Sequence, residues 1–149
     1  MRAVLEEGPT KTFKSPGTGE SRLNISVIFT SEPATAAALG TAASLADRLG
    51  GRITLIVPEV VSYQLPLNEP PIKRAWYETR VCELVSHVPV ETVVRFYFCR
   101  DRNETLAKVL TPQSLVVIGA ARRWWLTPER MLARRLRRLG HEVILTETE

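Results

Sequence analysis

Short apolar runs alternate with amphipathic segments along most of the chain. Five runs have the length and the β-branched or aromatic content of strands: residues 24–29, 52–57, 90–99, 114–118 and 142–146. Between them, apolar residues recur at helical spacing and predict four helices. Strands and helices that alternate in this way join through right-handed crossovers. The pattern therefore predicts an α/β fold with an open, mostly parallel five-stranded sheet and helices on both faces.

Capping residues indicate where two of the helices begin and end. Ser31 stands at an expected N-cap, and Gly50 can end the same helix in the left-handed conformation. Near the C-terminus, Thr127 followed by Pro128 is typical of a helix start. The core face of that last helix is predicted to consist of Leu132, Leu136 and Leu139.

Proline and glycine indicate where regular structure stops. Residues 1–22 contain Gly8, Pro9, Pro16, Gly17 and Gly19 but few apolar side chains. We therefore expect a flexible N-terminal arm, in which residues 1–5 could still dock as an edge strand. Residues 23–149 are expected to form a single domain. Pro58 is expected to end the second strand.

The composition, 44% hydrophobic and 24% charged, is that of an ordinary globular protein. We expect a cytoplasmic protein without a membrane partner, because no apolar run could span a bilayer and no signal-peptide core is present. Cys82, Cys99, His87 and His141 lack metal-ligand spacing, so no metal site is expected. We find no catalytic constellation either, which favours a function other than catalysis. A small hydrolase or transferase would rest on fold analogy alone.

Positive charge is concentrated in one part of the chain. The formal net charge is +4, while residues 119–141 hold seven Arg and one Glu, or +6, which leaves −2 for the rest. A local basic patch can attract phosphate-bearing partners, although solvated Arg on a helix surface is commoner. Nucleic acid is not an expected partner, because aromatic residues are not interleaved with the Arg of the last helix and no reading motif occurs.

Four stretches, taken together, resemble the universal stress protein family over residues 23–146. Residues 31–34, Ser-Glu-Pro-Ala, resemble the family's Asp-Gly-Ser-Glu-x-Ala turn after the first strand. Residues 52–57 and 90–95 resemble its second and third strands, and residues 114–119, Ser-Leu-Val-Val-Ile-Gly, resemble its Asp-Leu-Ile-Val-Met-Gly strand. The resemblance implies a Rossmann-like sheet of the adenine nucleotide alpha hydrolase type, with strand order 3-2-1-4-5.

The resemblance also implies a mode of assembly. Members of the family often form homodimers by pairing the last strand. In this chain the strand would contain Val143, Ile144 and Leu145.

ATP or AMP is the ligand that the resemblance implies. Nucleotide-binding members use an Asp at the end of the first strand and a backbone contact near the end of the second, here Val57. They also use a loop of the form Gly-x2-Gly-x9-Gly-Ser/Thr after the fourth strand. In this chain Phe29 occupies the position of the Asp and Thr30 follows it. A phenyl ring cannot accept the hydrogen bonds that a carboxylate would accept from a nucleoside.

The glycine loop also departs from the family pattern. Gly119 matches its first glycine, but Arg122 stands at the second and Leu126, ahead of Thr127, at the last. Thirteen positions separate the first and last glycines of the motif, against seven here (126 − 119). Backbone amides can cradle phosphates only where the chain adopts conformations that favour glycine. We therefore expect typical ATP binding to be lost and no cofactor to be needed.

Two interpretations of this loop remain open. Arg122 and Arg123 can match phosphate oxygens with their guanidinium forks, or they can be solvated or pair with acids such as Glu129. Trp124 and Trp125 can stack on a ligand, or they can plug the crevice beside Phe29 or contact a protein, which we favour. The favoured function is a regulatory or interaction module with an unknown protein partner. The alternative is a sensor for a nucleotide or other phosphate anion, bound through Thr30, Ser31, Gly119, Arg122, Arg123 and Thr127.

Overall fold

The structure is a computed structural model that describes residues 10–13, 23–60, 74–121 and 127–148. Within these residues the strands are β1 (Thr10–Phe13), β2 (Asn24–Ile28), β3 (Arg52–Val60), β4 (Thr92–Cys99), β5 (Leu115–Ala121) and β6 (Glu142–Thr148). The helices are α1 (Glu32–Leu49), α2 (Arg74–Ser86), α3 (Arg102–Val109) and α4 (Pro128–Arg138).

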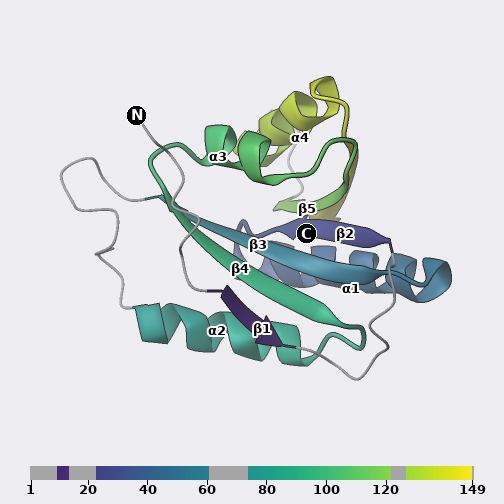
Figure 1. Cartoon of the computed structure of the whole chain (residues 1–149), viewed down its shortest axis with the longest axis vertical. Helices are drawn as coiled ribbons and strands as arrows, with labels where there is room; N and C mark the ends of the chain where they lie inside the picture. Colours follow the sequence, from purple (N-terminus) through teal and green to yellow (C-terminus); the bar gives the residue numbers. More distant parts are fainter. Residues whose placement is uncertain (1–9, 14–22, 61–73, 122–126, 149) are drawn as a thin grey trace.

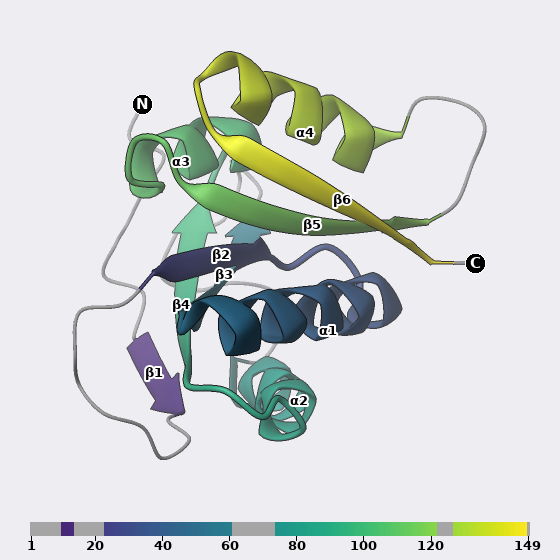
Figure 2. The ribbon, with the colours of Figure 1, turned by 90° about the vertical axis from the view of Figure 1, so that its right-hand side faces the viewer.

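The strands form one sheet in the order β1-β4-β3-β2-β5-β6 (Figures 1 and 2). The strands from β2 to β6 are parallel, and in their own chain order they stand as 3-2-1-4-5. β2 lies at the centre, where Ile28 pairs with Ile56 of β3 on one side and Ile118 of β5 on the other. The predicted α/β sheet and its strand order are confirmed, and the topology is Rossmann-like.

β1 is a sixth strand that the apolar pattern does not predict. It pairs antiparallel with β4 at the edge of the sheet, from Thr10 opposite Arg95 to Phe13 opposite Thr92. Its sequence, Thr-Lys-Thr-Phe, is short and polar, so only its partner strand identifies it. Residues 1–5, where an edge strand was considered, lie outside the described residues.

Helices cover both faces of the sheet, as predicted (Figure 2). One core cluster packs α1 and α2 on one face, with Phe96 as its largest fully buried side chain. The second packs α3 and α4 on the other face around Leu106, Leu132 and Leu136. Because both faces are buried, the central strands consist of almost uninterrupted apolar residues.

The second parallel strand does not end at Pro58, contrary to expectation, but continues to Val60. The amide of Ile53 donates to Glu91, on the β4 side, and the carbonyl of Ile56 accepts from Phe29, on the β2 side. Alternation places Pro58 on the same side as Ile56. Because β2 has already ended at Ile28, the missing amide of Pro58 breaks no bond between strands.

The expected caps of α1 and α4 are present, but one predicted core residue is not in the core. Ser31 and Thr127 are the N-caps, and Gly50 ends α1 with φ +70°. Leu139, predicted to face the core, is 52% exposed. It is the C-cap of α4, where the chain leaves the helical path, so the periodicity of the helix no longer determines its orientation.

Candidate functional site

The carboxyl ends of β2 and β5 form the topological switch point of the sheet. From β2 the chain passes through α1 to β3 on one side, and from β5 it passes through α4 to β6 on the other. Ligands of open α/β sheets bind in the crevice at such a point. Figure 2 shows that the ends of β5 and β6 and the start of α1 lie on this same side of the molecule.

Thr30 joins the two strand ends at the switch point. Its hydroxyl donates a hydrogen bond of 3.1 Å to the carbonyl of Gly119, 89 residues further along the chain. Its amide donates to the hydroxyl of Thr35 over 3.0 Å. Thr35 is completely buried in the first turn of α1. Thr30 therefore links β2, β5 and α1 in a small polar network.

Gly119 packs directly against the backbone of α1. A Cβ atom at this position would lie 1.9 Å from the carbonyl oxygen of Ala34, well inside van der Waals contact. Gly119 is buried in β5 and pairs with Thr146 of β6. Close packing of helix on strand is therefore sufficient to require glycine here, whether or not a ligand approaches.

The N-terminus of α1 uses most of its hydrogen-bonding groups internally. The hydroxyl of Ser31 accepts from the amide of Ala34, 3.4 Å away, and its carbonyl accepts from the amide of Thr35 over 2.8 Å. Pro33, in the same turn, has no amide hydrogen to offer. This helix start therefore offers fewer amides to an anion than an open helix N-terminus does.

An ion pair also occupies the start of α1. Arg80 of α2 donates to both carboxylate oxygens of Glu32, at 2.7 and 3.1 Å. The hydrogen bond with Arg80 lowers the pKa of Glu32, and that with Glu32 raises the pKa of Arg80. The negative charge on Glu32 interacts favourably with the helix dipole, and Arg80 neutralises it, so the pair adds no net charge to this helix start.

The other described candidates at this edge also have structural roles. Phe29 is half-buried and packs against the first core cluster, and its amide donates to Ile56 over 2.9 Å. Val57 is completely buried in the same cluster. Thr127 is 5% exposed, and its hydroxyl accepts from the amide of Arg130 as the cap of α4.

Of the residues that the sequence predicts at the site, the structure brings Thr30, Ser31 and Gly119 together. Four others lie outside the described residues: Arg122, Arg123, Trp124 and Trp125.

The described residues offer little chemistry for a metal site or for catalysis. They contain no group of three or more His, Cys, Asp or Glu that could hold a metal ion. Burial raises the pKa of the Cys99 thiol, which makes it a poorer nucleophile. His141 is buried, and its Nδ1 accepts from the amide of Ser114 over 3.1 Å, a bond that ties the starts of β5 and β6.

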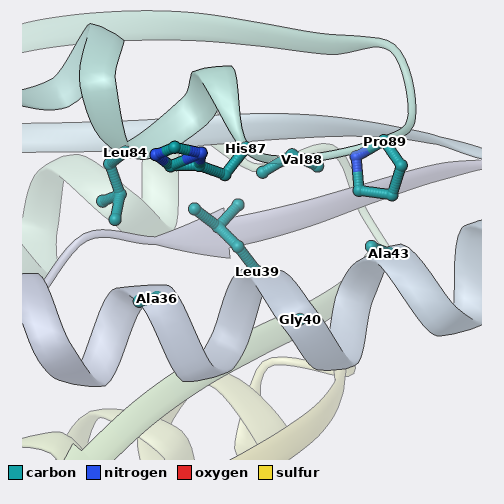
Figure 3. Close-up of a pocket in the computed structure, with 8 residues that line it drawn as sticks. All are labelled: Ala36, Leu39, Gly40, Ala43, Leu84, His87, Val88 and Pro89. Atoms are coloured by element: carbon teal, nitrogen blue, oxygen red, sulfur yellow. The ribbon is translucent and has the colours of Figure 1, made fainter.

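A separate apolar hollow of about 190 Å³ lies between α1 on one side and, on the other, the end of α2 with the segment that joins it to β4. Figure 3 shows Leu39 and Gly40 of α1 facing Leu84, His87 and Val88 across it. His87 is the titratable residue among those that line it, and it is exposed. The sequence gives no signal for this hollow, because its walls come from segments that meet only in the folded chain.

The comparisons with known proteins do not assign this chain to a family. No protein-family model matches the chain, and no curated protein matches it significantly. No helix in the described part of the chain has the length and apolar character needed to cross a membrane. The parallel sheet of order 3-2-1-4-5 is thus the part of the resemblance that the structure supports directly.

Proposed function

We propose that this chain is a universal-stress-protein-like regulatory or interaction module that does not bind ATP in the manner typical of that family. The observation that carries the proposal is the hydrogen bond from Thr30 to Gly119 at the switch point. It occupies polar groups at the place where a nucleotide would sit, next to a glycine already packed against Ala34. Phe29, at the position of the family's Asp, packs into the core and offers no carboxylate.

Titration with ATP, ADP and AMP tests this proposal. We expect no saturable binding in the micromolar range by isothermal titration calorimetry, because the groups at the start of α1 are engaged with one another. Micromolar binding that disappears in Arg122→Ala would contradict the proposal and establish the phosphate sensor instead. Arg48→Ala, an exposed position on α1, controls for loss of one positive charge.

We propose, in addition, that two copies pair through β6, with Val143, Ile144 and Leu145 at the contact. β6 is an edge strand of the sheet. The amide of Glu142 donates to Ser114, toward β5, so alternation directs the backbone groups of Val143 and Leu145 away from β5. Arg137 donates to the carbonyl of Val143 over 2.9 Å and covers part of this edge. An exposed strand edge can pair with a strand of another chain, and a side chain that covers part of the edge limits this pairing.

Two substitutions with opposite effects test the β6 contact. Leu145→Pro removes an outward amide and is expected to shift the chain from dimer to monomer. Arg137→Ala uncovers the Val143 carbonyl and is expected to strengthen dimerisation. Sedimentation equilibrium would distinguish a 16.7 kDa monomer from a particle of twice that mass. A chain that stays monomeric at every concentration, or a dimer that Leu145→Pro leaves intact, would contradict pairing through β6.

A further inference from the structure

A hollow of about 410 Å³ lies between α3 and α4, away from the switch-point crevice. Figures 1 and 2 show the two helices side by side on the same face of the sheet. α3 contributes Asn103 to its wall, and α4 contributes four residues from successive turns of one face. The described residues of that face are Met131, Arg134, Arg135 and Arg138.

The three arginines of the hollow lack acidic partners among the described residues, whereas other arginines of α4 are engaged. Arg130 pairs with Glu147, and Arg137 donates to the carbonyl of Val143. No carboxylate belongs to the described wall of the hollow. The nearest acids of α3 have local roles, since Asp101 caps the helix and Glu104 lies 3.8 Å from Lys108. Positive charge is therefore left uncompensated in a concave place.

Asn103 adds a neutral polar side chain to the wall of the hollow. The residue is half-buried, yet its Oδ1 is shielded from solvent and has no hydrogen-bond partner in the described structure. An amide can turn to present either its oxygen or its NH₂ group. Because the shielded Oδ1 does not face the water-accessible hollow, the NH₂ group is the end of the amide that can donate to an anion held by the arginines.

The spacing of the arginines indicates the class of ligand. Arg134 and Arg138 are four residues apart, and Arg135 and Arg138 are three apart, so their side chains emerge next to one another on α4. Guanidinium forks match phosphate oxygens in a bidentate way. Met131, 56% exposed, adds an apolar surface beside them. A nucleic-acid interface would instead need a basic stripe with interleaved aromatic residues.

We propose that the hollow between α3 and α4 binds a small organic phosphate, whose phosphate group is held by Arg134, Arg135, Arg138 and Asn103 and whose organic part lies against Met131. This site is separate from the switch-point crevice of the proposed function. Phosphate binding here would give a function to the positive charge that is concentrated in the last quarter of the chain.

Titration with phenyl phosphate and with pyrophosphate at constant ionic strength tests this site, with two-dimensional NMR locating the shifts. We expect saturable binding of phenyl phosphate that shifts the signals of Asn103 and Met131. The double variant Arg134→Ala/Arg138→Ala should weaken binding at least about tenfold, because charge-assisted hydrogen bonds are lost. Met131→Ala should weaken phenyl phosphate binding and leave pyrophosphate binding unchanged.

The matched control removes the same charge elsewhere. Arg48→Ala/Arg95→Ala changes two exposed arginines of α1 and β4 and should alter the affinity less than about twofold, since screening weakens distant surface charges. Equal losses in both double variants would overturn the site. So would the absence of saturable binding, or tighter binding of a single-stranded oligonucleotide that Arg134→Ala/Arg138→Ala abolishes. Binding lost in Arg122→Ala alone would belong to the switch-point crevice and would also overturn the proposal.

Discussion

Gly119→Ala is expected to lower the free energy of unfolding by about 3 kcal/mol, the upper part of the range for overpacked sites, or to prevent folding. The added Cβ would meet the carbonyl oxygen and carbon of Ala34 at 1.9 and 2.5 Å. These atoms belong to the backbone at the start of α1, so they cannot move aside as a flexible side chain would. The helix start would have to shift, and the bond from Thr30 to Gly119 would be strained with it. Urea unfolding followed by circular dichroism measures the effect.

Gly40→Ala is the matched control for Gly119→Ala. Gly40 lies within α1 beside the apolar hollow, and a Cβ there would meet no atom within 4 Å. Because alanine is the better helix former, we expect this variant to gain about 0.5–1 kcal/mol. Wild-type stability in Gly119→Ala would show that β5 and α1 are not packed as closely as described.

The role of Gly119 changes the meaning of the sequence resemblance. In the family pattern the matching glycine opens a phosphate loop, whereas here helix packing already requires a glycine. Retention of Gly119 is therefore no evidence for a nucleotide. Phe29, which offers no carboxylate, and the short interval from Gly119 to Thr127 carry more weight, because neither follows from the packing of Gly119 against α1.

The sequence was sufficient to predict most of the fold, because the signals concerned are local. The β-branched runs and the helical spacing gave the parallel strands and the helices. Ser31 and Thr127 gave the starts of α1 and α4 correctly, since a capping side chain bonds an amide three residues ahead.

The errors and omissions in the predicted fold arise where residues distant in the sequence determine the local structure. Pro58 stays inside β3 because the neighbouring β2 is shorter, which no local pattern reveals. β1 exists through its pairing with β4, more than 70 positions away. Leu139 continues the spacing of α4 in sequence, but the helix ends before it.

The candidate site was predicted less completely than the fold. Thr30, Ser31 and Gly119 were expected near one another, and the parallel topology places them so. That Thr30 bonds to Gly119 and Thr35 depends on how α1 seats on the sheet, which requires three dimensions. The hollow between α3 and α4 could not be predicted either, because Asn103 and Arg134 line the same hollow only through tertiary packing.

Leu136→Ala is expected to lower the free energy of unfolding by about 2–5 kcal/mol. Leu136 is completely buried in the second core cluster, with Leu132 of α4 and Leu106 of α3. Truncation removes apolar contacts and leaves a cavity that neighbouring side chains fill only in part. Thermal or urea unfolding of the purified variant measures the change.

Leu139→Ala provides the control in the same helix, with the same pair of residue types. Leu139 is 52% exposed, so its truncation should change the free energy of unfolding by no more than about 0.5 kcal/mol. Equal losses in the two variants would indicate that α4 continues past Arg138 and buries Leu139, as the sequence periodicity suggested. A large loss in Leu136→Ala alone would support the described helix end. It would also support the orientation that points Arg134, Arg135 and Arg138 at the hollow, because the buried leucine sets the rotation of α4 about its axis.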